Sequence, residues 1–246
     1  MTLLLDIGNS RIKWAWWDGR LLHGHNSLAH EGKPPSGLPG ALAAGPATTR
    51  AVICSVAGDP MDTALAELLA GQGIPDHRFV TSGMAPAGVT SSYPDPASLG
   101  ADRWAALLAT HALGLAPACI IDCGTAVTVD LLDAEGRHRG GLIFAGLGLS
   151  RRALTQGTYH LDEPDGGDLP EFAADTATAV RSGTVQALVG AVEYMIVRAT
   201  RVLGGTPMVV LTGGDAAIVA EWISVANVRL QPDLVLLGLA VVAGQD

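Results

Sequence analysis

The sequence predicts an α/β protein built from two similar halves, each with a mixed β-sheet flanked by helices. Residues 3–14 and 119–130 follow nearly the same pattern: an apolar run, then Asp-x-Gly, a small polar residue, and alternating polar and apolar positions. Each repeat is followed by a turn and a further segment that returns along the sheet. A length of 246 residues allows two domains, and 31 glycines suit a turn-rich α/β chain. We therefore expect domains at 1–116 and 117–246.

The first half is expected to open with three short strands, because alternating apolar residues are broken by turn residues. Asp18-Gly19, between two of these segments, is a strong hairpin signal. Residues 31–50 are rich in Gly, Pro and Ala and are expected to form a loop or a weak helix. The expected strands of this half cover residues 3–8, 11–17, 20–26, 51–56 and 79–81, and the expected helices cover 60–71 and 101–114.

The second half is expected to repeat this order of strands and helices. The acidic, glycine-rich residues 161–175 are expected to form an exposed loop. The apolar run at 234–244 is expected to form a last helix that packs back on the first domain. The other expected elements are strands at 118–123, 126–132, 137–144 and 208–211, a helix from near Ser150, a helix at 176–203 and a helix opened by Gly213-Gly214-Asp215.

The composition argues against several classes of protein. A net charge of −9 at pH 7 and a pI near 5.1 indicate no basic surface for nucleic acid. The longest late apolar run, 234–244, is about half as long as the ~20 residues of a membrane-spanning helix. The N-terminus lacks the basic region of a signal peptide, and the cysteines are expected to fill the core in a reducing compartment. We therefore expect a soluble, cytoplasmic protein.

Asp6 and Asp122 each end an apolar strand, where a buried carboxylate is costly unless it is paired or metal-bound. One interpretation is that they hold Mg²⁺, which keeps several waters and binds one or two carboxylates together with substrate phosphates. The alternative is that each aspartate only caps its turn as an Asx-turn. Because the motif occurs twice, we favour metal binding.

The residues after each aspartate suit a nucleotide phosphate chain held from two sides. Gly8 and Gly124 allow backbone N–H groups to approach an anion closely. Lys13 is in reach of a β- or γ-phosphate, and its alternative role is that of a solvent-facing strand lysine. Side-chain donors follow the two glycines at Asn9, Ser10 and Thr125.

Four motifs occur in order along the chain: Asp6-Ile-Gly-Asn-Ser-Arg-Ile-Lys-Trp14, Gly100-Ala-Asp-Arg103, Asp122-Cys-Gly-Thr-Ala126 and Thr212-Gly-Gly-Asp215. Together they resemble the type III pantothenate kinase family, also known as the Bvg accessory factor family. They correspond to its first phosphate motif, its pantothenate motif, its second phosphate motif and its adenosine motif. The family belongs to the acetate-and-sugar-kinase/Hsp70/actin superfamily. The resemblance therefore implies a duplicated ribonuclease H-like (actin-like ATPase) fold.

The resemblance implies that Asp102 is the general base for the primary hydroxyl of pantothenate and that Arg103 binds the polar end of the substrate. From the residues alone, Asp102 could instead complement a helix N-terminus and Arg103 form a surface ion pair. Because phosphoryl transfer to an alcohol needs an acceptor for the hydroxyl proton, we favour the catalytic role. Gly100 belongs to the same substrate motif.

Further substrate contacts are implied for Tyr93 and for Thr176, which would reach the pantothenate of a partner subunit. The alternative for Tyr93 is a loop aromatic packed on Pro94. The resemblance also implies that Gly213 and Gly214 bring backbone against adenine or ribose. Three positions depart from the usual residues of the family: Leu99, Ala145 and Asp175.

We expect ATP-dependent phosphorylation of pantothenate to 4′-phosphopantothenate, the first step toward coenzyme A. The resemblance implies Mg²⁺, a monovalent cation (K⁺ or NH₄⁺) and a homodimer. Two alternatives remain: a kinase for another small alcohol or sugar, and a non-catalytic ATP-binding regulatory protein. The second is disfavoured because the aspartates and the arginine of the motifs are intact.

Overall fold

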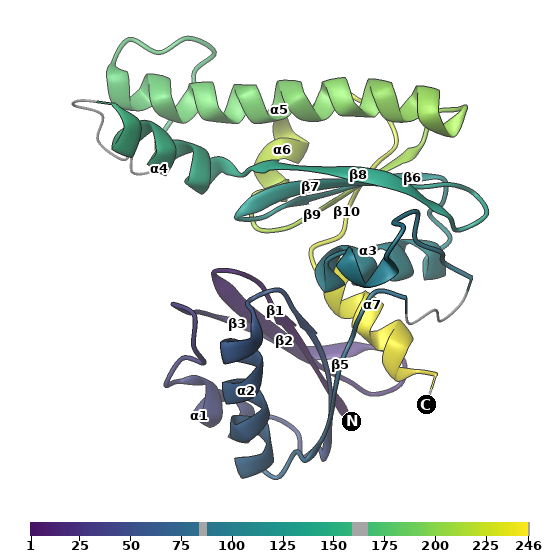
Figure 1. Ribbon diagram of the computed structural model, residues 1–246. Coiled ribbons are helices and arrows are strands. Elements are labelled where there is room, and N and C mark those ends of the chain that lie inside the picture. Colours follow the sequence, from purple (N-terminus) through teal and green to yellow (C-terminus); the bar gives the residue numbers. More distant parts are fainter. Residues whose placement is uncertain (84–87, 159–166, 246) are drawn as a thin grey trace. The chain divides into compact units, whose positions relative to one another are not determined.

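The computed structural model describes residues 1–83, 88–158 and 167–245 (Figure 1). The chain divides into two compact units. One comprises Met1–Leu115, Glu135–His138 and Asp233–Asp246, and the other comprises Ala116–Ala134 and Arg139–Pro232. The last helix, α7 (Leu234–Ala243), is therefore part of the first unit.

The first unit contains a five-stranded sheet in the order β3-β2-β1-β4-β5. The first three strands along the chain are antiparallel neighbours, whereas β4 runs parallel to β1 and β5 runs parallel to β4. The sheet is therefore mixed, as predicted. The strands are β1 (Thr2–Ile7), β2 (Arg11–Trp17), β3 (Leu22–Ala29), β4 (Arg50–Ser55) and β5 (Asp76–Phe79).

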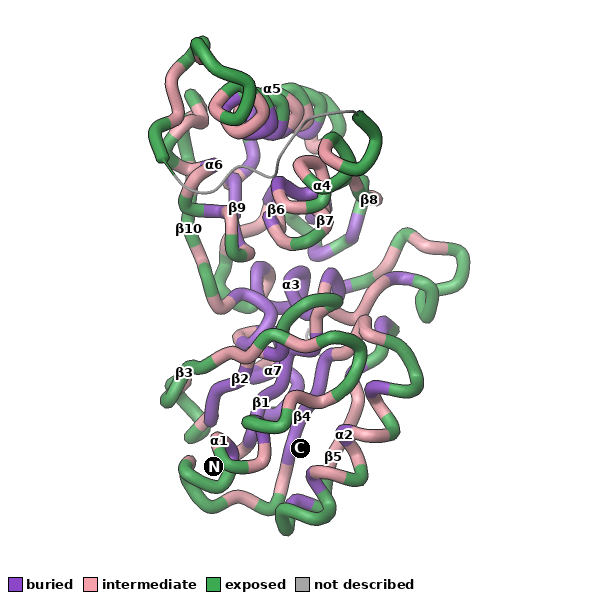
Figure 2. Tube along the Cα trace, turned by 90° about the vertical axis from the view of Figure 1, so that its left-hand side faces the viewer, coloured by how far each residue is buried: buried purple, intermediate pink, exposed green. Residues whose placement is uncertain are grey.

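Helices cover both faces of this sheet. Leu3, Leu5 and Ile7 of β1 form a core with α1 (Leu38–Ala43) and α2 (Asp59–Gly71). Because side chains alternate along a strand, Asp6 belongs to the opposite face. There α7 contacts β1, β2 and β4 and packs on α3 (Ala101–Ala112), whose residues are mostly buried (Figure 2). A short 3₁₀ turn, η1 (Pro96–Ser98), precedes α3.

The second unit repeats the topology of the first. Its sheet has the order β10-β9-β6-β7-β8, so β6 takes the central place of β1, with a hairpin partner on one side and a parallel strand on the other. The duplication seen in the sequence is therefore also a duplication of sheet order. The strands are β6 (Ala118–Cys123), β7 (Ala126–Leu132), β8 (His138–Ala145), β9 (Met208–Thr212) and β10 (Val228–Leu230).

The core of the second unit lies between this sheet and a long helix, α5 (Thr176–Leu203), which Figure 1 shows along β6 and β7. Apolar residues of β6 and β9 pack against Val185, Val192 and Ile196 of α5. The Asp175 side chain caps α5 by accepting a hydrogen bond of 2.9 Å from the Thr178 N–H. Two shorter helices complete the unit: α4 (Leu147–Gly157) and α6 (Ala216–Trp222).

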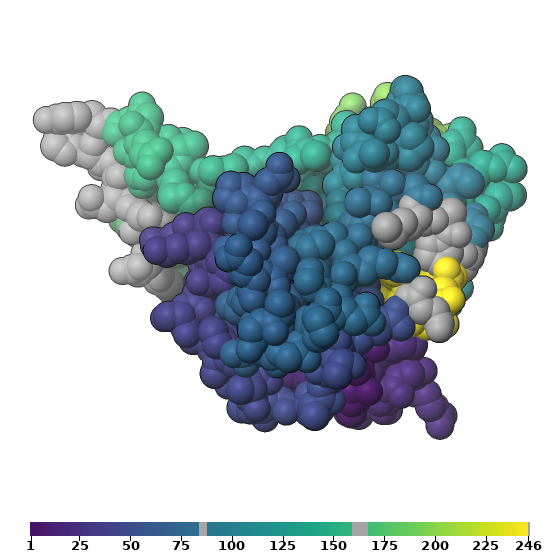
Figure 3. Space-filling view, turned by 60° about the horizontal axis from the view of Figure 1, so that its bottom comes forward, coloured from purple at the N-terminus to yellow at the C-terminus, as the bar shows by residue number. Residues whose placement is uncertain are grey.

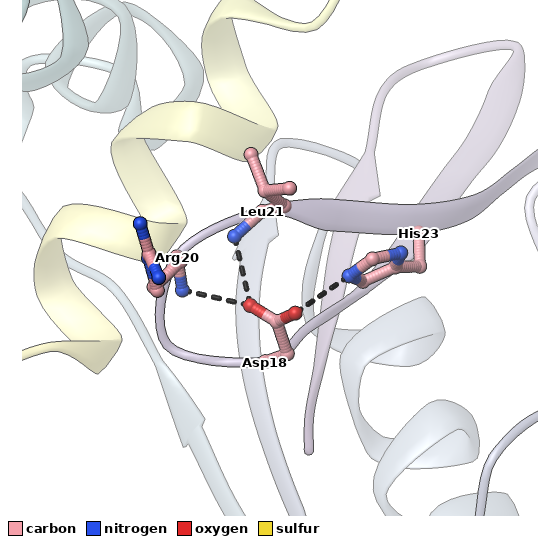
Figure 4. A network of polar contacts seen from close by, with 4 residues as sticks. All are labelled: Asp18, Arg20, Leu21 and His23. Carbon is pink, nitrogen blue, oxygen red and sulfur yellow. Dashed lines mark hydrogen bonds and ion pairs between the residues drawn. The ribbon is translucent and has the colours of Figure 1, made fainter.

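The Asp18-Gly19 turn forms as predicted, and its geometry explains why (Figure 4). Asp18 Oδ1 accepts hydrogen bonds of 2.8 Å from the N–H groups of Arg20 and Leu21, while Oδ2 accepts one of 2.7 Å from His23 Nε2. These hydrogen bonds hold the pKa of Asp18 far below its usual value. The bond from the Leu21 N–H has the largest effect, and those from His23 and from the Arg20 N–H have smaller ones. Gly19 supplies the positive φ of 99° that the turn requires.

Most of the predicted elements are present, and the misses lie at sheet edges. The strand predicted at 79–81 is wrong, because β5 ends at Phe79 and consists mainly of polar residues that pair with β4. The edge strand β10 was not predicted, since its three residues are too few to establish an alternating pattern. Residues 161–166 of the predicted exposed loop lie outside the described residues.

Candidate functional site

The first phosphate motif forms the turn between β1 and β2. Asp6, at the end of β1, is 7% exposed and lies opposite Lys13 in the antiparallel register. The Gly8 N–H donates to the Arg11 carbonyl over 3.0 Å, which closes the turn. The side chains of Asn9 and Ser10 are exposed on the turn. The hairpin therefore presents polar side chains at one end of the sheet.

His30 holds this turn from the side of β3. Its Nε2 lies 2.8 Å from the Gly8 carbonyl oxygen, and its backbone N–H donates to the Ser10 carbonyl over 3.1 Å. These bonds engage the carbonyl groups of the turn. The backbone at the predicted phosphate motif is thus fixed by a residue far from it in sequence.

The substrate motif lies at the start of α3. Asp102 is in the first turn of this helix, and its Oδ1 accepts a 2.7 Å hydrogen bond from the Arg103 N–H. The carboxylate folds back over Gly100 so closely that a Cβ there would lie 2.7 Å from Asp102 Oδ1. Gly100 therefore leaves the space that the Asp102 carboxylate occupies.

Arg103 is 6% exposed, so its side chain is buried and does not lie on the surface. Its Nη1 donates to the Tyr93 hydroxyl over 3.0 Å, and its Cζ lies 5.7 Å from the centroid of the Tyr93 ring. The chain just before α3, residues 94–98, is exposed, and Figure 3 shows this blue part of the chain at the surface. Tyr93 and Arg103 are therefore in contact, and the exposed residues 94–98 directly follow Tyr93 in the chain.

The second phosphate motif forms the turn between β6 and β7. Asp122 lies opposite Thr128, as Asp6 lies opposite Lys13, and the Gly124 N–H donates to the Ala126 carbonyl over 3.2 Å. Thr125 is exposed at the turn. The two hairpins therefore match in register around the aspartate but differ in the residue across from it.

The adenosine motif packs directly on this turn. The Asp215 N–H donates to the Cys123 carbonyl over 3.0 Å. Gly213 has φ 92°, and a Cβ there would lie 2.6 Å from the Cys123 carbonyl atoms and closer still to Asp122 Oδ1. By contrast, Gly214 is exposed and has open space at its Cβ position. Gly213 is thus the residue that allows the two motifs to meet.

Burial shifts the pKa values of two groups where the adenosine motif packs on the β6–β7 turn. Burial raises the pKa of the Cys123 thiol to about 12, and the carboxylates of Asp122 and Asp215 add to the shift. Burial also raises the pKa of Asp215, an effect that Arg151 of α4 partly opposes. Asp215 stands at the N-cap position of α6, but its side chain accepts no capping bond from the described first turn. Cys123 is therefore a protonated core thiol at neutral pH.

Gly146 completes the turn from the start of α4. Its N–H donates to the Thr125 carbonyl over 3.1 Å, and a Cβ there would lie 2.8 Å from the same oxygen. Gly146 was not among the predicted site residues. The glycine-rich run 140–148 was the signal for it, because clustered glycines indicate close backbone approach.

The predicted site residues thus form one cluster at the β1–β2 hairpin, one at the start of α3 and one around the β6–β7 turn. Thr176 is exposed at the first position of α5. Within the described residues, His, Cys, Asp and Glu do not gather in groups of three that could hold a metal ion. Mg²⁺ bound mainly by water and phosphates needs only one or two carboxylates, so Asp6 and Asp122 fit it chemically.

Across residues 1–83, 88–158 and 167–245, no helix has both the length and the apolarity to cross a bilayer.

Comparison with known proteins places these features in a family. A family model described as type III pantothenate kinase matches residues 2–198. A protein of Azoarcus sp. (strain BH72) named type III pantothenate kinase is 41% identical over 248 residues, covering 100% of this chain and 92% of that protein.

Solved structures agree on the fold. A Baf family protein from Campylobacter jejuni superposes with a TM-score of 0.60 at 19% identity, covering 99% of this chain and 98% of that one. A second solved structure is the activator of 2-hydroxyisocaproyl-CoA dehydratase from Clostridium difficile with bound ADPNP. It superposes with a TM-score of 0.52 at 13% identity, covering 99% of this chain and 94% of that one. Together with the repeated sheet order, these likenesses confirm the predicted duplicated ribonuclease H-like, actin-like ATPase fold.

Proposed function

The chain belongs to the type III pantothenate kinase family, and we propose that it transfers the γ-phosphoryl group of ATP to the primary hydroxyl of pantothenate. The products are 4′-phosphopantothenate and ADP, and the reaction is the first step toward coenzyme A. The observation that carries the proposal is the start of α3, where a carboxylate and a buried arginine stand side by side in the substrate motif.

Asp102 is the general base of this reaction. Its carboxylate accepts the proton of the pantothenate hydroxyl while that oxygen attacks the γ-phosphorus and the bond to ADP breaks. The hydrogen bond from the Arg103 N–H and the close fit over Gly100 hold the carboxylate in one place. Positioning of this kind supplies much of the catalysis, because the loose transition state asks little covalent chemistry of the protein.

Arg103 binds the carboxylate end of pantothenate. A guanidinium is the side chain best suited to a carboxylate, since its planar fork can donate two parallel hydrogen bonds. The Tyr93 hydroxyl, 3.0 Å from Nη1, orients the fork. Tyr93 also contacts pantothenate, and Gly100 contributes backbone to the same subsite.

ATP is held by the turns of the two hairpins and by the loop after β9. Gly8, Asn9, Ser10 and Lys13 bind phosphates in the first unit, and Gly124 and Thr125 bind phosphates in the second. Gly213 and Gly214 contact the adenosine. Mg²⁺, held through Asp6 and Asp122, would neutralise charge on the β- and γ-phosphate oxygens when bound.

The family resemblance supports three further proposals. A monovalent cation, K⁺ or NH₄⁺, takes part in the reaction. The protein acts as a homodimer in which Thr176 reaches the pantothenate of the partner subunit. The protein is cytoplasmic, in keeping with three buried cysteines that form no disulfide among the described residues.

A direct assay tests the function. The purified chain is incubated with ATP, Mg²⁺ and K⁺ and either pantothenate or one of a panel of sugars, and ADP and the phosphorylated product are measured. We expect turnover with pantothenate alone and a product with the mass of 4′-phosphopantothenate. Turnover on a sugar but not on pantothenate, or no turnover on any acceptor, would contradict the proposal. Omission of Mg²⁺ or K⁺ tests each cation separately.

A further inference from the structure

His138, the first residue of β8, is 1% exposed although its side chain is polar. Its backbone N–H donates to the Thr90 carbonyl over 2.8 Å, and the Thr90 N–H donates to the Gly136 carbonyl over 3.0 Å. Thr90 also forms a parallel bridge with Arg137. These bonds fix the start of β8 against the segment that leads to Tyr93, so the backbone determines where His138 lies.

The His138 side chain packs on the candidate pantothenate subsite. Its ring centroid lies 5.7 Å from that of Tyr93, with 33° between the ring planes. Its Nδ1 lies 3.4 Å from the hydroxyl oxygen of Ser92, the residue before Tyr93. Since Tyr93 in turn accepts the hydrogen bond from Arg103, the contacts run from His138 through Tyr93 to Arg103.

We propose that His138 is a positioning residue for pantothenate binding and acts through Tyr93 and Arg103. The inference rests on the proposed function, in which those two side chains contact pantothenate. A phenol ring without a neighbour on the His138 side gains rotamers, and the guanidinium it orients gains freedom with it. Ordering both groups on binding would then cost affinity. His138 keeps Tyr93 and Arg103 ordered before pantothenate binds, so this cost does not arise. It does not touch the reacting atoms.

Substitution of His138 separates this role from catalysis. We expect His138→Ala to raise the KM for pantothenate about tenfold, while kcat and the KM for ATP stay within about twofold. His138→Phe retains a ring against Tyr93 and should recover most of the affinity. His111→Ala is the matched control, because it removes another histidine ring from the same region. The His111 ring packs against Gly136, where a Cβ would lie 3.0 Å from it. This variant should leave the KM for pantothenate unchanged.

A double-mutant cycle tests whether His138 acts through Tyr93. In a Tyr93→Ala background, His138→Ala should cause no further rise in the KM for pantothenate. A rise of the same size in both backgrounds would overturn the inference, and so would an unchanged KM in the single variant. Should His138→Ala give no folded protein, His138→Leu, which fills a similar volume without an aromatic ring, replaces it with the same expected result.

A chemical probe tests the inference independently of turnover. Phenylglyoxal modifies accessible guanidinium groups, and the labelling rate of Arg103 can be followed by peptide mass spectrometry. We expect labelling to be at least about threefold faster in His138→Ala than in the unmodified chain, because the side chain that covers Arg103 is released. An equal rate would overturn the inference. If the unmodified chain fails to phosphorylate pantothenate, the proposed function falls, while this comparison still decides whether His138 holds Tyr93 against Arg103.

Discussion

Lys13 lies directly opposite Asp6 in the antiparallel pair of β1 and β2. Directly opposite residues of such a pair place their side chains on the same face of the sheet. Lys13 is half-buried there, whereas the corresponding residue of the second hairpin, opposite Asp122, is Thr128. The duplicated hairpins therefore share the aspartate and differ in what faces it.

This difference predicts unequal roles for the two hairpins in ATP binding. Lys13→Met should raise the KM for ATP about 10- to 100-fold, because a charge-assisted hydrogen bond to a phosphate is worth about 1.5–3 kcal/mol. The KM for pantothenate should change little. Thr128→Val, at the corresponding position of the second hairpin, should leave both values close to normal. Steady-state kinetics measures both KM values in each variant, and an unchanged KM for ATP in Lys13→Met would remove Lys13 from the phosphate site.

The close fit of Gly100 and Asp102 makes a second prediction. In Gly100→Ala the new Cβ would lie 2.7 Å from Asp102 Oδ1, so the carboxylate must move. Turnover should fall about 10- to 100-fold, since small displacements of a reacting group are costly. The fold should survive, because the φ of −52° at this position suits alanine and the clash involves only the end of a side chain. Gly71→Ala, where a Cβ has open space, is the control and should keep full turnover.

Two adjacent glycines give a third prediction, which concerns stability. Gly213→Ala should destabilise the protein by about 2–4 kcal/mol, because the backbone is left-handed and the new Cβ meets the Cys123 carbonyl. Gly214→Ala should change stability by less than about 0.5 kcal/mol, since its Cβ position is open. Thermal and urea unfolding of the two variants measure the contrast. Equal stabilities would mean that the loop can relax away from the β6–β7 turn.

How far the sequence predicts this fold depends on the range of the interactions involved. The β1–β2 and β6–β7 hairpins are predictable because turn residues and alternation are local signals. The α5 helix has the predicted limits, since Asp175 caps its start and Gly204, with φ 74°, ends it. The polar edge strand β5 lacks a local signal, because its pairing with β4 and not its own alternation makes it a strand.

The same limit applies to the candidate site. The placement of Asp6 and Lys13 on one hairpin follows from their spacing. The packing of His138 on Tyr93 and of Gly213 on Cys123 does not, because each contact joins segments that are distant in sequence. Glycine-rich stretches indicate that a close approach exists but not which backbone approaches. Partners of this kind become visible only in the folded chain.

The cap of α5 predicts a specific dependence of stability on pH. The Thr178 N–H lowers the pKa of Asp175 from its ordinary value of 3.8. A lowered folded-state pKa stabilises the fold above the unfolded-state pKa, and this contribution is lost as the pH falls through the folded-state pKa. The Tm of Asp175→Ala should therefore lie below that of the unmodified chain at pH 7, and the gap should shrink below about pH 4.

Melting curves at pH 7, 5, 4 and 3 measure this gap. Asp175→Asn is the matched control, because asparagine also accepts a hydrogen bond at an N-cap but does not titrate. Its Tm at pH 7 should lie nearer to that of the unmodified chain than the Tm of Asp175→Ala does. A gap for Asp175→Ala that stays constant from pH 7 to pH 3 would show that the ionised cap contributes nothing.

The central claim is that Asp102 takes the proton of the pantothenate hydroxyl. Asp102→Asn tests it most directly, because the amide oxygen can still accept the hydrogen bond from the Arg103 N–H but cannot act as a base. The measurement is kcat with saturating ATP and pantothenate, together with the Kd of pantothenate by calorimetry. We predict a Kd within about threefold of normal and a kcat lower by about 10²- to 10⁴-fold. A kcat close to that of the unmodified chain would contradict the account.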